Sequence, residues 1–201
     1  MTDLFAHKAE EWDKRPVPAQ ISEGVFQAIQ ENVSLSPSMT VMDFGAGTGL
    51  ICSKLAPLVK QVYAVDISAA MLEKLCEKIE LKEKVETFCQ NILETPLSQK
   101  VDLVVSAMAM HHVEDTQQLL HTLSSHMHAG GTIAIADLDK EDGDFHPADV
   151  EGVYHDGFER ETLVPLFEEA GFTDVSFVTA CEVQKEEKAY PIFLVTARKT
   201  S

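Results

Sequence analysis

Three glycines followed by a helix form the pattern in this sequence that could bind a ligand. Gly45, Gly47 and Gly49 follow a short apolar run, residues 40–44, and precede an apolar helical pattern that starts at Leu50. Glycine lets a backbone turn tightly and approach a ligand where a Cβ atom would collide. A strand, a glycine turn and a helix N-terminus in that order leave free backbone N–H groups that point at whatever lies over the turn. The pattern predicts a pocket of the nucleotide-binding type.

Asp66 adds most of the specificity to this pattern. It ends a second apolar run, residues 61–66, about twenty residues past the turn. A carboxylate accepts hydrogen bonds and donates none, so at the tip of the neighbouring parallel strand it suits the two hydroxyls of a ribose. The alternative is that Asp66 only caps the next helix, but Ser68 is well placed for that task. We expect Asp66 to bind a ligand.

Three histidines are candidate catalytic residues. His111 and His112 follow a fourth apolar run, and His155 lies in a polar, acid-rich segment, residues 138–158, which also carries His146 and Tyr154. A histidine near neutral pKa can act as the general base that deprotonates a hydroxyl or an amine. For His112 a structural role, hydrogen-bonded behind the ligand, fits equally well. The histidines at 121, 126 and 128 are interpreted as surface or helix-end groups, and no spacing predicts a metal site.

The elements that must position these residues alternate between strands and helices. Apolar runs at residues 40–44, 61–66, 85–88, 101–106 and 132–137 are separated by helical patterns, and two further strands at 175–183 and 192–197 flank a polar turn. This order predicts an α/β fold, a Rossmann-like, mostly parallel seven-stranded sheet with helices on both faces and a C-terminal antiparallel hairpin. At 201 residues the chain fits a single domain. Ligands of open parallel sheets bind beyond the carboxyl ends of the strands, where Ala107 and the two adjacent histidines would lie.

The charge and composition of the chain limit the kinds of partner and the cellular compartment that suit it. The 33 acidic and 16 basic residues give a net charge of -17, which opposes nucleic acid and anionic membrane surfaces. The N-terminus lacks the apolar segment of a signal peptide, and no run is long enough to cross a bilayer. The cysteines are scattered, so they are interpreted as small buried groups in a reducing compartment, which favours the cytoplasm. These cysteines are Cys52, Cys76, Cys89 and Cys181.

Residues 43–49, Asp-Phe-Gly-Ala-Gly-Thr-Gly, resemble the first motif of the class I S-adenosylmethionine-dependent methyltransferases, and residues 65–68 resemble the second. A dinucleotide fingerprint would instead need glycine or alanine where Leu50 stands. The resemblance implies S-adenosylmethionine as cofactor, with the glycine loop on its methionine part and Asp66 on its ribose. Asn91 would accept from the adenine amino group, and the N–H of Ile92 would meet a ring nitrogen. The expected cofactor-binding residues are Asp43, Gly45, Ala46, Gly47, Thr48, Gly49, Asp66, Ile67, Met71, Asn91, Ile92, Ala107 and Trp12.

The same resemblance implies a lid, and the position of residues 138–158 after the fifth strand, at the ligand end of the sheet, predicts a substrate loop. Residues 1–34 would form an N-terminal arm and lid helix; Trp12 in this arm fits a closing role and an ordinary packing role about equally. Residues 138–158 would close over the acceptor, although a plain surface loop also suits their polarity. The acidic residues of this loop favour a neutral or cationic acceptor.

The expected function is methyl transfer from S-adenosylmethionine to an O or N atom of a small-molecule acceptor. Methylation of a basic protein is the alternative within this class. A nucleotide-binding oxidoreductase and a non-catalytic cofactor-binding module are the alternatives outside it.

Overall fold

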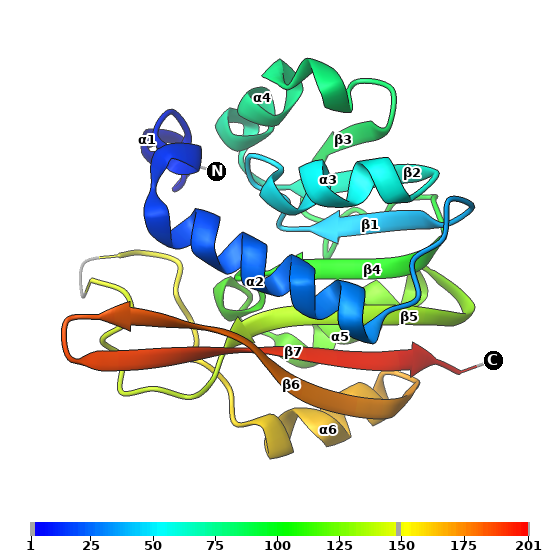
Figure 1. Cartoon of the computed structure of the whole chain (residues 1–201). Coiled ribbons are helices and arrows are strands. Elements are labelled where there is room, and N and C mark those ends of the chain that lie inside the picture. The colour runs from blue at the N-terminus through cyan, green and yellow to red at the C-terminus, as the bar shows by residue number, and fades with distance from the viewer. Residues whose placement is uncertain (1–2, 148–149, 201) are drawn as a thin grey trace.

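The computed structural model describes residues 3–147 and 150–200. Seven strands form one sheet in the order β3-β2-β1-β4-β5-β7-β6 (Figure 1). Strands β1 to β5 pair in parallel, whereas β7 runs antiparallel to both β5 and β6. The fold class predicted from the sequence is confirmed. The strands are β1 (Thr40–Phe44), β2 (Gln61–Asp66), β3 (Val85–Cys89), β4 (Val101–Ala107), β5 (Met127–Leu138), β6 (Phe172–Lys185) and β7 (Lys188–Lys199).

In the described part of the chain, six α-helices connect or cover these strands. Two of them start at the side-chain caps that local sequence provides: Ser68 Oγ accepts from the N–H of Met71, and the Asp115 carboxylate accepts from the N–H of Gln118. The prediction that Ser68 caps its helix is confirmed. The helices are α1 (Ala6–Ala9), α2 (Pro16–Asn32), α3 (Leu50–Leu55), α4 (Ala69–Glu77), α5 (Thr116–Ser125) and α6 (Arg160–Glu169). A short 3-10 turn, Met110–His112, follows β4.

Two hydrophobic cores lie on opposite faces of the sheet. In β4, Leu103 and Val105 pack with helices α2, α3 and α4, whereas Val104 between them packs with α5 and α6. The alternation follows from the period of two along a strand. Figure 1 shows α2 and α3 in front of the sheet and α5 and α6 behind it. Because both faces are covered, the carboxyl ends of the parallel strands remain as the place where polar side chains can gather.

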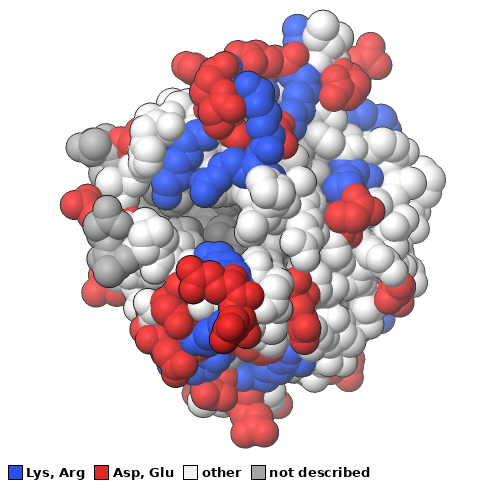
Figure 2. All heavy atoms as spheres, turned by 60° about the vertical axis from the view of Figure 1, so that its left-hand side comes forward, with Lys and Arg blue, Asp and Glu red and all other residues white. Residues whose placement is uncertain are grey.

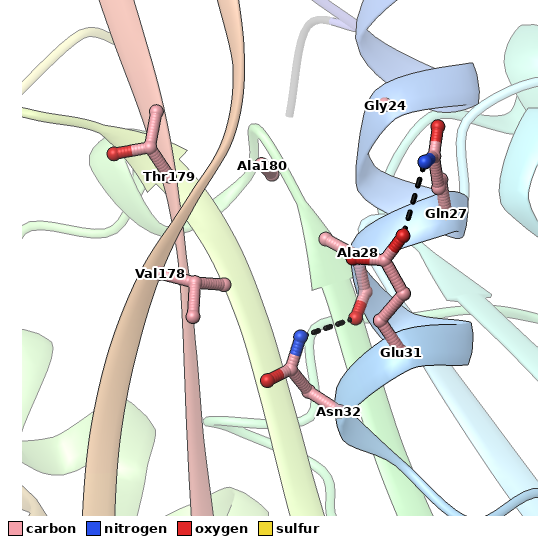
Figure 3. Close-up of a pocket in the computed structure, with 8 residues that line it drawn as sticks. All are labelled: Gly24, Gln27, Ala28, Glu31, Asn32, Val178, Thr179 and Ala180. Carbon is pink, nitrogen blue, oxygen red and sulfur yellow. Dashed lines mark hydrogen bonds between the residues drawn. The ribbon is translucent and has the colours of Figure 1, made fainter.

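Helix α2 approaches the edge strand β6 closely at Gly24. A Cβ atom at this position would lie 2.6 Å from the Cβ of Cys181, so the close contact requires glycine. Beside it, a groove of about 420 Å³ runs between α2 and β6 (Figure 3). Figure 3 shows two of its polar groups bonded within the helix, Gln27 to Glu31 and Asn32 to the carbonyl of Ala28. A second groove, of about 430 Å³, lies between α4 and β3.

The sequence-based expectations fail in two details. All four cysteines are free, but Cys76 and Cys89 are exposed because they lie on the outer side of α4 and on the edge strand β3. The 138–158 segment was expected to stay out of the core, yet Phe145 and Phe158 are buried in the two cores. Among the described residues, no helix is both long and apolar enough to span a membrane.

Candidate active site

The glycine turn joins β1 to α3, contacts the end of β2, and leaves space above one of its own residues. The N–H groups of Gly45 and Ala46 both donate to the carbonyl of Val65, at 2.9 and 3.1 Å. A Cβ atom on Gly45 would lie 2.3 Å from the Cβ of Ala109, so the chain after β4 packs directly on the turn. Gly47, at φ 54°, is the opposite case, because no heavy atom lies within 4 Å of the place where its Cβ would be. The turn is therefore closed at Gly45 and open at Gly47.

Asp66 faces this open position. Its carboxylate accepts from the N–H of Gly47 at 2.7 Å and from the N–H of Ser68 at 2.8 Å. A carboxylate can accept about four hydrogen bonds, so roughly two positions remain for other donors. Burial raises the pKa of Asp66, although the two N–H groups act in the opposite direction. Asp66 can therefore accept from the two hydroxyls of a diol, which can approach the turn at Gly47 because no side chain lies there.

Asp43 lies underneath the turn instead of facing it. Its side chain is 1% exposed, and the thiol of Cys52 donates to it at 3.1 Å. Burial raises the pKa of Asp43 to about 7, and the negative charge of Asp66 adds to this effect. Asp43 thus lies behind the turn, and its role as a cofactor-binding residue stays a prediction.

The other expected cofactor residues surround the turn. Thr48 and Met71 are buried, Ile92 is fully buried, and Ile67 is 57% exposed next to Asp66. Asn91 follows β3; its carbonyl oxygen accepts from the N–H of Leu93 and its amide donates to Glu94. The oxygen that would accept from an adenine amino group thus already holds one hydrogen bond and has one lone pair left. Gly49, at φ 82°, caps α3, and Ala107 ends β4 beside the turn.

The N-terminal arm, residues 3–15, covers this part of the site. The hydroxyl of Thr48 donates to Asp13, whose carboxylate also pairs with Lys78 at 2.7 Å. Near the start of the arm, Asp3 accepts from the hydroxyl of Ser68 at 2.8 Å. Trp12 belongs to the same arm, and Arg15 lies over its ring at 5.4 Å. Sequence reasoning placed the arm here but did not identify its acidic anchors.

A histidine cluster lies beyond β4 and β5. His111 Nδ1 lies 2.7 Å from the carboxylate of Asp137, at the end of β5, and both side chains are buried. His146 Nε2 lies 3.1 Å from His111 Nε2. Asp137 only accepts, so His111 carries its proton on Nδ1 and accepts at Nε2 from the N–H of His146. Burial opposes ionisation of Asp137, yet its contacts with His111 lower the pKa of this carboxyl below its ordinary value.

The two neighbouring imidazoles are held neutral. His112 donates from Nδ1 to the carbonyl of Gly152 at 2.6 Å, and burial together with nearby His111 lowers its pKa to about 4. Burial, followed by His111 and His112, lowers the pKa of His146 to about 3. The centroid of the His111 ring lies 4.1 Å from that of His112 and 5.0 Å from that of His146. A neutral imidazole has a lone pair that can take a proton.

His155 is placed differently from the other two candidate bases. Its Nε2 lies 2.9 Å from the carbonyl of Val113 and 3.2 Å from that of Glu114, and its ring packs on Phe158 at 5.0 Å. It ties the 138–158 segment to the chain after β4. His146, which the sequence places in the predicted substrate loop among the groups able to meet an acceptor, lies beside His111. The described residues contain no group of three or more His, Cys, Asp or Glu arranged to hold a metal.

This architecture, a glycine turn with an acid on the next strand of a mostly parallel sheet, defines an α/β enzyme that binds a nucleoside cofactor. Residues 18–177 match the family described as the methyltransferase domain, and the chain belongs to this family. It is an S-adenosylmethionine-dependent methyltransferase. The oxidoreductase alternative is thereby set aside.

Relatives and solved structures agree with this assignment. The chain is 31% identical to an uncharacterized methyltransferase of Schizosaccharomyces pombe over 70% of its own length and 55% of the relative's, so it spans about half of that protein. It is also 31% identical to an uncharacterized methyltransferase of Geobacillus thermodenitrificans, over 87% of this chain and 89% of the relative. The fold is similar to that of the N-methyltransferase NodS from Bradyrhizobium japonicum in complex with S-adenosylhomocysteine, with a TM-score of 0.74, 16% identity and full coverage of both chains.

Proposed function

We propose that this enzyme methylates an O or N atom of a small-molecule acceptor, with a histidine relay as its general base. The observation that carries the proposal is the contact series from Asp137 through His111 to His146 at the carboxyl ends of β4 and β5. His111 is 1% exposed, whereas His146 is only half-buried, and among the described residues no partner is recorded for its Nδ1. His146 is therefore the member of the relay that can meet an acceptor.

The cofactor residues follow from the open turn. S-adenosylmethionine supplies an electrophilic methyl group on a sulfonium sulfur. Asp66 would bind the ribose diol with its free lone pairs, and Gly47 would leave room for the cofactor where a side chain would collide. Asn91 and Ile92 would lie at the adenine, and the arm with Trp12 would cover the site. Asp43 and Met71 would support these contacts from the buried side of the turn and from helix α4.

The relay takes the proton that the acceptor must lose. The acceptor O–H or N–H donates to Nδ1 of His146, and the proton on Nε2 of His146 moves to Nε2 of His111. Asp137 stabilises the imidazolium that forms on His111, because a carboxylate 2.7 Å from Nδ1 favours the charged ring. His112 and His155 hold the surrounding loops through backbone carbonyls, so we assign positioning roles to both.

The test uses two variants of the relay and one control. His146→Gln and His111→Gln should each lower kcat/KM by roughly 10²- to 10⁴-fold in a screen for methyl transfer to small hydroxylated and amino compounds. Their affinities for S-adenosylhomocysteine, measured by calorimetry, should stay at the wild-type level because neither histidine is assigned to the cofactor. His121→Gln, an exposed position on α5, serves as the control. Wild-type turnover in both relay variants would show that the relay is not the base.

We further propose that residues 1–201 form one domain that works in the cytoplasm and does not act on nucleic acid or membranes. The supporting observations are a single sheet shared by all seven strands, four free cysteines and the net charge of -17.

A further inference from the structure

Three cations at the mouth of the candidate active site, Lys8, Arg15 and Lys185, lack a carboxylate partner among the described residues, although the chain has a net charge of -17. Among the described residues, Lys8, Arg15 and Lys185 form no ion pair, and their recorded contacts are with aromatic rings and one carbonyl. Lys8 lies over Phe5 and Lys185 over Phe145, the latter with Nζ 3.7 Å from the ring centroid. Other cations of the described residues, such as Lys60 and Lys82, also form no ion pair, but Lys8, Arg15 and Lys185 differ from them in lying over aromatic rings.

The nearby acidic groups are already occupied. Asp144 accepts from Lys188 at 2.8 Å and from the hydroxyl of Tyr190 at 2.9 Å. Glu141 accepts from three backbone N–H groups, those of residues 143, 144 and 145. Asp13 is held by Thr48 and Lys78. The acidity of the 138–158 segment, from which we expected a neutral or cationic acceptor, is thus offset in part by Lys188 of the hairpin and by backbone N–H groups.

The unpaired lysines lie on two sides of the histidine cluster. On one side, Lys8 contacts Phe5, whose ring lies 5.2 Å from that of His112. On the other, Lys185 contacts Phe145, whose ring lies 5.0 Å from that of His146. The rings of the two histidines are 5.9 Å apart and join the two sides.

The charges of both lysines reach the cluster. Lys185 and Lys8 each contribute to lowering the pKa of His146. Burial lowers the pKa of Lys185 and Arg15 adds to this effect, whereas the charges of Glu141 and Asp144 raise it. Lys185 is partly buried and forms no ion pair among the described residues, so a bound anion would further offset the cost of burying its ammonium group.

Figure 2 shows the face on which the parallel strands end, with a hollow near its centre. Lysine and arginine side chains occur on both rims of this hollow, above it and below it in the view, and acidic side chains gather farther out on both sides. The residues of the arm and of the β6–β7 hairpin supply cations to the two rims, so an anion entering the hollow would be attracted from both sides.

We propose that the methyl acceptor is an anion whose carboxylate or phosphate binds between Lys8 and Lys185, with Arg15 nearby. This proposal rests on the methyl transfer proposed above and names the class of its acceptor. Held in this way, the acceptor would present a hydroxyl or amino group to Nδ1 of His146, while its anionic end meets the two lysines. A basic protein segment would instead bring further positive charge to this mouth, which disfavours it.

The binding test does not depend on turnover. The probes are benzoate, phenyl phosphate and the neutral benzamide, titrated into the full chain saturated with S-adenosylhomocysteine, with the Cε1–H resonances of His146 and His112 as the NMR readout. Saturable shifts are expected with benzoate or phenyl phosphate, and none with benzamide. Comparison of the two anions separates a carboxylate site from a phosphate site.

Substitutions of the lysines test where the anion binds. Lys185→Gln and Lys8→Gln should each raise the Kd for the bound anion by about tenfold, the loss expected for one charge-assisted contact. Lys185→Arg should restore binding, and Lys60→Gln, an exposed lysine just before β2 at the other end of the sheet, should leave it unchanged. The two lysine positions are independent, so loss of folding in one variant leaves the other as the test.

Two results would overturn the proposal. In one, neither anion shifts the histidine resonances, or benzamide shifts them as strongly. In the other, Lys185→Gln and Lys8→Gln weaken S-adenosylhomocysteine binding instead of anion binding, which would assign these cations to the cofactor's own carboxylate. If the anion binds as expected while the relay variants retain full turnover, the anion site stands and the relay is wrong.

Discussion

Replacing Asp43 with asparagine should stabilise the protein by an amount that grows as the pH rises toward 7. Asp43 is buried beneath the glycine turn, and burial raises its pKa from 3.8 to about 7. A carboxyl whose folded pKa lies above its unfolded value contributes its full stability below about pH 4 and loses it as the pH rises through about 7. At neutral pH and above, the folded protein therefore carries a carboxylate that would be more favourable in water.

The size of this effect follows from the pKa difference. About three pH units at about 1.36 kcal/mol each give a total on the order of 4 kcal/mol, of which about 2 to 3 kcal/mol falls between pH 5 and pH 8. Asparagine has nearly the same shape and no charge, and its carbonyl oxygen can still accept from the thiol of Cys52, which lies 3.1 Å from the carboxylate in the wild type. The variant thus removes the ionisation and keeps the packing.

Urea unfolding followed by far-UV circular dichroism at pH 5, 6, 7 and 8, without cofactor, measures the effect. The difference in unfolding free energy between Asp43→Asn and the wild type should increase over this range, because groups that do not interact with Asp43, such as His112 and His146, titrate alike in both proteins. Glu80→Gln, at an exposed position, should show a constant difference. A difference for Asp43→Asn that stays constant from pH 5 to pH 8 would refute the reasoning, since Asp43 would then titrate at its ordinary pKa.

Three further predictions concern the cofactor side and the loop. Asp66→Ala should weaken S-adenosylhomocysteine binding by well over tenfold in calorimetry, since two charge-assisted hydrogen bonds are worth roughly 1.5 to 3 kcal/mol each. Asp66→Asn should have a milder effect. An unchanged Kd in a folded Asp66→Ala protein would reject the assignment of Asp66 to the ribose. Gly47→Ala should lose cofactor binding while retaining its circular dichroism, whereas Gly45→Ala, whose methyl group would meet Ala109 at 2.3 Å, should lower the Tm without any ligand. His155→Ala should lower the Tm and the turnover together while cofactor affinity is kept, and a variant equal to the wild type in both would remove His155 from the site.

The parts of the fold and site that local sequence determines were predictable. Strands β1 and β2 have the bounds expected from their apolar runs, and the glycine turn lies directly between β1 and α3. Asp66 was found because a strand end about twenty residues beyond the turn must lie beside it in a parallel sheet. Ser68 was recognised as a cap because capping depends on a contact only three residues away, with the N–H of Met71.

Contacts that depend on tertiary packing could not be predicted from the local sequence. The acidic anchors of the arm, Asp3 and Asp13, bind residues 65 and 35 positions further along the chain, Ser68 and Thr48. Nothing in the local pattern distinguishes these two acids from the other exposed acids of the chain. The exposure of Cys76 and Cys89 was missed for a related reason, since only the strand order shows that β3 is an edge strand with an open outer side.

The histidine relay contains one contact between neighbouring strand ends and one contact that depends on how a loop folds. Asp137 ends β5, and its pairing with His111 spans the ends of the parallel neighbours β4 and β5. His146 lies 35 residues from His111 in sequence, and its position depends on how the 138–158 segment folds. The β6–β7 hairpin holds that segment, since Lys188 binds Asp144 and Lys185 donates to the carbonyl of Phe145, the residue before His146. Both strands of the hairpin extend beyond the runs predicted for them, which brings its tip to the segment. The side chain that we assign to the acceptor is thus positioned by the C-terminal strands, and its neighbour in the hairpin, Lys185, is one of the cations that would bind the acceptor's charge.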